Sequence, residues 1–254
     1  MTENIQSLTR SLKSLFRLSL LAAITLGGTQ AQDWDYGTVH GPEHWSELSR
    51  DYHLCKAGRN QSPVDIRDPI SADLPVLELT YQPTLAKILN NGHTIEVDFN
   101  LLVNKLSIGN HDYLLQQIHF HTPSEHHLNG QEFPLEAHFV HRDSQGNLAV
   151  VAVLFDLGPL NPSLDSLWAL LPEEPGLQKD LTSPLDPASL IPASRDYFRY
   201  SGSLTTPPCS EGVLWIVLKN HFTATDQEIA KFAHLVHGHN NRSVQPAFAR
   251  EILE

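Results

Sequence analysis

The sequence reads QIHFH at residues 117–121 and EAH at residues 136–138. The first stretch lies in a run of apolar, β-branched and aromatic residues, which is typical of a strand. Side chains alternate between the two faces of a strand, so His119 and His121 are predicted to share one face. Residues 135–140 predict a second strand, close enough in sequence to be a hairpin neighbour that brings His138 to the same place.

Three neutral imidazoles with one open position hold a catalytic zinc, whereas structural zinc sites are usually closed and rich in cysteine. The pattern therefore predicts a metal that activates water. Two other interpretations stay open. The histidines could lie half-buried in the sheet without a metal, although burying unpaired imidazoles costs free energy. Glu125 follows His121 at the spacing of cupin barrels, but the cupin glycine spacings and a second cupin motif are missing.

The first 31 residues have the pattern of a secretory signal. Arg10, Lys13 and Arg17 precede an apolar stretch at residues 18–26, and small residues follow it. This stretch is too short to span a bilayer. We expect cleavage after Ala31 and export, most simply to the periplasm, with outright secretion or a retained N-terminal anchor as the alternatives.

Residues 32–254 are long enough for one domain with a substantial core. Loss of the signal removes three basic residues and Glu3, which changes the formal net charge from −12 to −14. A binder of nucleic acid or of anionic membranes would normally carry the opposite sign. The mature chain has no basic patch, P-loop or dinucleotide fingerprint, and no segment apolar enough to cross a membrane.

The chain has two cysteines, Cys55 and Cys209. An even count in an exported protein predicts one disulfide, and two free buried thiols are the alternative. The spacing between the two residues is far too wide for a local metal or redox motif.

Short strand-like runs recur along the chain, separated by turn signals such as NNG at residues 90–92. Helical patterns are fewer and cover residues 163–171 and, after Thr225 as N-cap, residues 226–237. The proline-rich stretch 159–192 is interpreted as a surface connection. These patterns predict one β-dominated α+β domain with a large sheet and short peripheral helices. The predicted strands span residues 86–89, 94–99, 105–108, 113–121, 135–142, 148–155 and 212–220.

Several longer motifs follow one another along the mature chain. They are YG at 36–37, GPEHW at 41–45, QSPVDI at 61–66, NNGH at 90–93, QIHFH at 117–121, PSEH at 123–126, EAHFVH at 136–141 and GSLTTPPC at 202–209. In these motifs and their order the sequence resembles the α-class carbonic anhydrases of the exported bacterial type. The resemblance implies a mostly antiparallel, twisted central sheet with zinc at the base of a conical cleft. It also implies reversible hydration of carbon dioxide to bicarbonate and a proton by a zinc-bound hydroxide.

The resemblance further implies roles for individual residues. His119, His121 and His138 correspond to the zinc ligands. His93 corresponds to the proton shuttle, and the ordinary pKa of imidazole suits proton relay near neutral pH. Thr205, oriented by Glu125, corresponds to the residue that orients the zinc-bound hydroxide. The other implied residues are Gln117 and Glu136 on the outer nitrogens of the ligands, His126 and Tyr200 behind them, Tyr36 and Asn91 on the waters of the proton path, and Val140, Val150, Leu204, Thr206, Val213 and Trp215 in the substrate pocket.

One position departs from the pattern, since Glu96 stands where relatives often have Asn or Gln. The alternative function is a non-catalytic protein of the same fold that stores zinc or serves as an interaction domain. Such relatives typically lose a zinc ligand, and here all three are present. The expected cofactor is Zn²⁺, the expected small-molecule partners are carbon dioxide and bicarbonate, and relatives of this type are often homodimers.

Overall fold

The computed structural model describes residues 34–99, 101 and 103–254. The predicted signal at residues 1–31 lies outside the described residues. Strands account for most of the regular structure. They are β1 (Asp65–Ile66), β2 (Leu77–Thr80), β3 (Lys87–Asn90), β4 (Ile95–Asp98), β5 (Lys105–Ile108), β6 (His111–His121), β7 (His127–Leu128), β8 (Leu135–Arg142), β9 (Leu148–Leu157), β10 (Gln178–Asp180), β11 (Tyr197–Ser203), β12 (Glu211–Leu218) and β13 (Phe222–Ala224).

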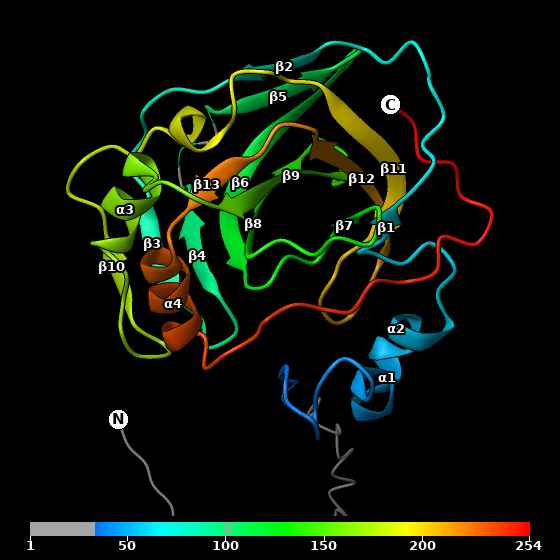
Figure 1. Ribbon diagram of the computed structural model, residues 1–254, viewed down its shortest axis with the longest axis horizontal. Coiled ribbons are helices and arrows are strands. Elements are labelled where there is room, and N and C mark those ends of the chain that lie inside the picture. Colours follow the sequence, from blue (N-terminus) through cyan, green and yellow to red (C-terminus); the bar gives the residue numbers. More distant parts are fainter. Residues whose placement is uncertain (1–33, 100, 102) are drawn as a thin grey trace, which may run out of the picture. The chain divides into compact units, whose positions relative to one another are not determined.

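Within the described part of the chain, eleven of these strands form one large sheet, and β1 and β7 form a separate pair. The main strand order is β10-β3-β4-β6-β8-β9-β12-β11, with β5 on β6, β2 on β5 and β13 on β9 (Figure 1). β12 and β13 run parallel to β9. The other strand pairs of this sheet among the described residues are antiparallel, so the predicted large, mostly antiparallel sheet is confirmed.

The helices are short and lie at the periphery of the sheet (Figure 1). They are α1 (Trp45–Leu48), α2 (Leu54–Ala57), α3 (Pro162–Trp168) and α4 (Asp226–Leu235), with 3-10 turns η1 (Arg50–Tyr52) and η2 (Pro187–Leu190). α4 begins with a capping box between Thr225 and Glu228, which satisfies two backbone donors and confirms the predicted N-cap. No helix of the described residues combines the length and apolarity that a bilayer span would need.

The larger hydrophobic core lies on one face of the sheet. Phe120, Phe139 and Phe155 point to this face from β6, β8 and β9 and are fully buried. The ring of Phe120 meets Trp168 of α3 at 4.8 Å and Phe232 of α4 at 6.1 Å between centroids. Burying an aromatic side chain of this size contributes about 3 kcal/mol. The helices α3 and α4 therefore cover this face of the sheet. The polar side chains of the same strands, among them His119, His121 and His138, lie on the opposite face.

A β-bulge in β6 decides which side chains face which side. The register with β8 shifts between Leu115 and Gln117, so Gln116 is an extra residue. Tyr113 and Leu115 are buried before the bulge, whereas Ile118 and Phe120 are buried after it. Without the extra residue, positions 117, 119 and 121 would keep the phase of Leu115 and face the hydrophobic core. The sequence pattern predicted one regular strand over residues 113–121, without this bulge.

Residues 159–192 do more than connect elements across the surface, which corrects the prediction. They contain α3, which confirms most of the helix predicted at residues 163–171. They also contain β10 and η2, which were not predicted, and β10 extends the sheet by pairing with β3. Leu164, Leu167 and Leu190 are buried in the larger core. Pro162 and Pro187 stand in the first turns of α3 and η2, where a missing N–H costs nothing. The prolines thus start helical turns here.

Cys55 and Cys209 form the predicted disulfide, across a sequence separation of 154 residues. It joins α2 to the loop that follows β11, the loop that also carries Thr205. Both half-cystines are buried and lie in a small cluster with Trp45. The disulfide therefore fixes the N-terminal segment to a loop of the site.

The Cys55→Ser/Cys209→Ser double variant should unfold more easily, because the open chain regains entropy that the crosslink removes from the unfolded state. We expect the free energy of unfolding to fall by about 3 kcal/mol. Urea unfolding followed by tryptophan fluorescence measures this. Reductant should weaken the wild-type protein and leave the double variant unchanged. Equal wild-type stability with and without reductant would contradict the prediction.

Candidate metal centre

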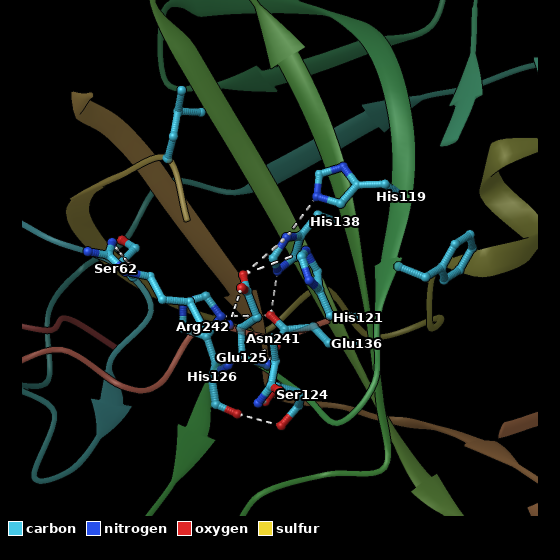
Figure 2. A network of polar contacts seen from close by, with 12 residues as sticks. Ser62, His119, His121, Ser124, Glu125, His126, Glu136, His138, Asn241 and Arg242 are labelled. Carbon is cyan, nitrogen blue, oxygen red and sulfur yellow. Dashed lines mark hydrogen bonds and ion pairs between the residues drawn. The ribbon is translucent and has the colours of Figure 1, made fainter. Parts of the chain in front are cut away.

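The three predicted ligands come together on the face of the sheet opposite the larger core. His119 in β6 stands directly opposite His138 in β8, and His121 follows two residues along β6. One nitrogen from each ring lies within 4.8 Å of the other two. Figure 2 shows the three rings turned toward one another beside Glu125. Strand alternation and the antiparallel register therefore build the cluster predicted from the sequence.

Hydrogen bonds fix the outer nitrogen of each ring. Nδ1 of His119 lies 2.7 Å from Oε1 of Gln117, and Nε2 of His138 lies 2.7 Å from Oε1 of Glu136. Nδ1 of His121 lies 2.7 Å from the backbone carbonyl of Asn240. All three partners are acceptors, so each outer nitrogen carries the proton of a neutral imidazole. The lone pairs are then left on the inner nitrogens.

These inner nitrogens fit a metal ion. Nε2 of His121 is buried without a hydrogen-bond partner, and Nδ1 of His138 lies 3.3 Å from Nε2 of His119. Burial lowers the pKa of all three rings, in the case of His121 to about 4, so the imidazoles are neutral near pH 7. Metal binding requires this neutral state. Three lone pairs that converge without protons are suited to zinc, which imidazole binds well.

Glu136 is held by four donors. Its Oε2 accepts the backbone N–H groups of Glu125 and His126 at 2.8 Å each. Its Oε1 lies 2.7 Å from ring nitrogens of both His126 and His138. Burial alone raises the pKa of this carboxyl, but the charges and hydrogen bonds of the two histidines together lower it well below its usual range. Nε2 of His126 lies 2.7 Å from the Tyr200 hydroxyl, so both residues lie behind the ligands as predicted.

Glu125 lies beside the ligands and is fully buried. Its Oε1 accepts the backbone N–H of Arg242 at 2.9 Å, and its Oε2 lies 3.6 Å from Nε2 of His121. Burial raises the pKa of Glu125 to about 7, although His138 and the Thr205 hydroxyl lower it in part. Thr205 is itself buried. The structure thus brings the predicted pair Glu125 and Thr205 together, and the role assigned to them stays a prediction.

His93 lies in the turn between β3 and β4. The side-chain oxygen of Asn91 accepts the backbone N–H groups of His93 and Thr94 at 2.9 Å each, which shapes the turn. The ring of Trp34 stacks on His93 with centroids 3.9 Å apart, and Tyr36 meets Trp34 edge-on. The position of His93 is therefore defined by an aromatic neighbour. The predicted part of Tyr36 and Asn91 in ordering waters stays a prediction.

Most of the predicted pocket residues form one apolar cluster on the same sheet face as the histidines. The ring of Trp215 lies 4.9 Å from that of His138, so the cluster reaches the candidate metal centre. Thr206 is half-buried in the loop after β11 and is not a member of the cluster. Val150, Val213 and Trp215 are buried members of the cluster, and Val140 and Leu204 are partly buried and pack against it.

Two buried residues that follow α4 contact the site and were not predicted from the sequence. Asn240 is fully buried and, besides its contact with His121, donates from its side chain to the carbonyls of His93 and Phe120. Arg242 is buried, and its guanidinium donates to Gln61 Oε1 and to the carbonyls of residues 55 and 62. Asn-Asn-Arg after a helix is a weak signal, because the contacts that matter are made by parts of the chain more than a hundred residues away.

A sheet-dominated domain in which three histidines turn their free nitrogens toward one point belongs to the class of proteins that could hold a metal ion through imidazole ligands. Residues 40–254 match the family described as eukaryotic-type carbonic anhydrase. The chain is 43% identical over 221 residues to a carbonic anhydrase of Neisseria gonorrhoeae, covering 87% of both chains. It is 41% identical over 236 residues to one of Pectobacterium carotovorum, covering 93% of this chain and 96% of the relative.

The solved structures agree. The alpha-carbonic anhydrase from Thermovibrio ammonificans, in complex with the inhibitor sulfanilamide, superposes with a TM-score of 0.85 at 46% identity, covering 87% of this chain and 99% of that one. The chain belongs to the alpha-carbonic anhydrase family, as the motifs implied. The family and the fold support carbon dioxide hydration as its enzymatic activity, and they exclude the cupin interpretation.

Proposed function

We propose that this enzyme hydrates carbon dioxide with a zinc ion held by His119, His121 and His138. Bound zinc would act as a Lewis acid that makes a water molecule acidic enough to lose its proton near neutral pH. The observation that carries the proposal is the convergence of three inner nitrogens whose outer partners are all acceptors. Neutral imidazoles leave the full charge of the metal available, whereas thiolate ligands would reduce it.

Glu125 and Thr205 would orient the nucleophile. The carboxylate of Glu125 is well placed to accept a hydrogen bond from the Thr205 hydroxyl, since the two side chains lie together in a buried site. The Thr205 oxygen is then left as an acceptor only. It would favour a nucleophile that still carries a proton, and disfavour ligands that have none to donate.

The apolar cluster would receive the substrate. Carbon dioxide has no charge and little polarity, so it binds favourably in an apolar pocket that water solvates poorly. Val150, Val213 and Trp215 are each 2% exposed, and the cluster extends to the ring of His138. These side chains also pack the sheet, and one apolar wall can serve both purposes.

His93 would carry the proton from the site to the buffer. The His93→Ala variant should turn over about a hundredfold more slowly in weak buffer, the scale of proton transfer by a positioned side chain. Added imidazole should restore most of the rate. Stopped-flow hydration at several imidazole concentrations measures this. His53→Ala, which removes an exposed histidine elsewhere, serves as control and should retain the wild-type rate. A slow His93→Ala variant that imidazole does not rescue would refute the shuttle.

The deciding experiment is stopped-flow carbon dioxide hydration before zinc is stripped with a chelator, after stripping, and after zinc is restored. Fast hydration that disappears and returns with zinc would support the proposal. One tightly bound zinc per chain without hydration would instead favour a zinc-storing or interaction protein of the same fold.

We further propose that the protein is exported and that cleavage follows Ala31. The disulfide supports this, because such bonds persist in oxidising compartments such as the periplasm. Mass spectrometry of the protein recovered from cell fractions tests both location and cleavage site. Sedimentation of the same sample distinguishes a monomer from the homodimer.

A further inference from the structure

Glu96 is the first member of a chain of hydrogen bonds that ends at a metal-ligating ring. β4 pairs with β6 so that Glu96 stands opposite His119. Oε2 of Glu96 accepts a hydrogen bond from Nε2 of Gln117 at 3.3 Å. Oε1 of Gln117 in turn lies 2.7 Å from Nδ1 of His119. The three side chains are therefore connected in one direction, from a carboxyl through an amide to an imidazole.

These hydrogen bonds require one orientation of the Gln117 amide, with Oε1 toward His119 and Nε2 toward Glu96. Its oxygen and nitrogen are nearly the same size, so shape alone does not choose between the two orientations. In the reversed orientation the NH₂ group would face Nδ1 of His119, and Nδ1 would have to accept. The ring proton would then move to Nε2, the atom that must offer its lone pair to zinc.

The carboxyl of Glu96 selects the orientation in which the Gln117 amide oxygen faces Nδ1 of His119. An ionised carboxylate only accepts, so it pairs with the NH₂ group and repels the amide oxygen. A protonated carboxyl also carries an O–H donor, but a side-chain hydrogen bond joins Glu96 to Asp98, so the O–H donates to Asp98 and the other oxygen is left to accept from the amide. This matters because burial, together with the neighbouring Asp98, raises the pKa of Glu96 to about 8. A glutamine or asparagine at this position could pair with either orientation of the amide.

We propose that Glu96 is a positioning residue that locks the Gln117 amide, and through it sets the His119 tautomer that zinc binding requires. The inference rests on the proposed zinc site and concerns its tuning. The competing explanation is that Glu96 merely adds negative charge near the metal. Asp98 distinguishes the positioning role from the charge effect. It lies on the same face of β4, opposite Gln117 in register, so its charge is in a similar place. Among the described contacts, no hydrogen bond joins its side chain to the Gln117 amide.

The test compares Glu96→Gln with Asp98→Asn at about pH 9, above the pKa of Glu96, where the two variants remove the same charge two residues apart. Zinc affinity is measured by competition with a chelator, and the His119 tautomer by ¹⁵N NMR of the imidazole in the zinc-free protein. Glu96→Gln should weaken zinc binding about three- to tenfold, a little less than the loss of a direct partner of a ligand. It should also give a mixture of His119 tautomers. Asp98→Asn should keep the single wild-type tautomer.

A Gln117→Leu background provides a second check. If Glu96 acts through the amide, Glu96→Gln should cause no further loss of zinc affinity once Gln117 is gone. Glu96→Ala should reproduce the tautomer mixture should the glutamine variant fold poorly.

Three outcomes would overturn the proposal: one unchanged tautomer in Glu96→Gln, equal effects of Glu96→Gln and Asp98→Asn, or an undiminished effect without Gln117. Failure of the wild-type protein to bind zinc would instead refute the proposed function, and the tautomer of the zinc-free protein would still decide the role of Glu96.

Discussion

The His121→Ala variant is expected to lose carbon dioxide hydration almost completely while keeping its fold. The variant leaves only two of the three imidazole ligands, and the lost atom, Nε2 of His121, is a buried nitrogen that has no hydrogen-bond partner in the protein. Zinc sites bind with about 10 to 16 kcal/mol in total, so one lost ligand should cost on the order of 3 kcal/mol, or about a hundredfold in affinity. Hydration rate and zinc affinity are measured on the same sample.

A matched control is available in the same strand. His111 is exposed at the start of β6, and His111→Ala should retain both hydration and zinc binding. Circular dichroism of each variant would show that the sheet is intact. Wild-type hydration by His121→Ala would refute the assignment of this ligand.

The Glu136→Gln variant is expected to have the largest effect on stability. The carboxylate accepts four hydrogen bonds inside the protein, and an amide can replace only one of its two oxygens. Two buried donors therefore lose their acceptor. Removing one partner from a buried charged network typically costs 3 to 5 kcal/mol, so we expect a loss of about 4 kcal/mol in the free energy of unfolding.

Urea unfolding of the zinc-free protein measures this loss, because bound zinc would add its own stabilisation. Glu132→Gln is the control. The side chain of Glu132 is 47% exposed and pairs with His127 at 3.6 Å, so its replacement should change the free energy of unfolding by less than about 0.5 kcal/mol. Equal stabilities of the two variants would contradict the role of Glu136.

The advantage of Glu136 over glutamine should also depend on pH. The pKa of Glu136 is lowered well below its usual range in the folded protein, so the stabilisation is fully present above the unfolded pKa of about 4.3. It is lost as the pH falls from there through the folded pKa, because the unfolded chain takes up the proton first. The difference in stability between wild type and Glu136→Gln should therefore shrink below about pH 4. A constant difference would show that the charge is unimportant.

Local sequence patterns were sufficient for a large part of the fold. The strand-like runs at residues 135–142 and 148–155 predicted β8 and most of β9, and Thr225 marked the start of α4. In the proline-rich residues 159–192 the predicted helix was found as α3, whereas the helical turn that begins at Pro187 was missed. Strands such as β2 and β11 were missed because packing against neighbours, more than local pattern, decides short strands.

The sequence by itself determined the donor set of the site: the spacing of His119 and His121 and the nearby strand with His138. Only the tertiary structure decided how these rings are aimed. The bulge at Gln116 turns them away from the hydrophobic core, and the backbone carbonyl of Asn240 fixes the ring of His121. The physical reason is that side-chain chemistry and period-two alternation depend only on neighbouring residues in the sequence, whereas a bulge depends on the register with a partner strand. A carbonyl oxygen is the same in every residue, so only the folded chain shows which one lies within hydrogen-bond distance.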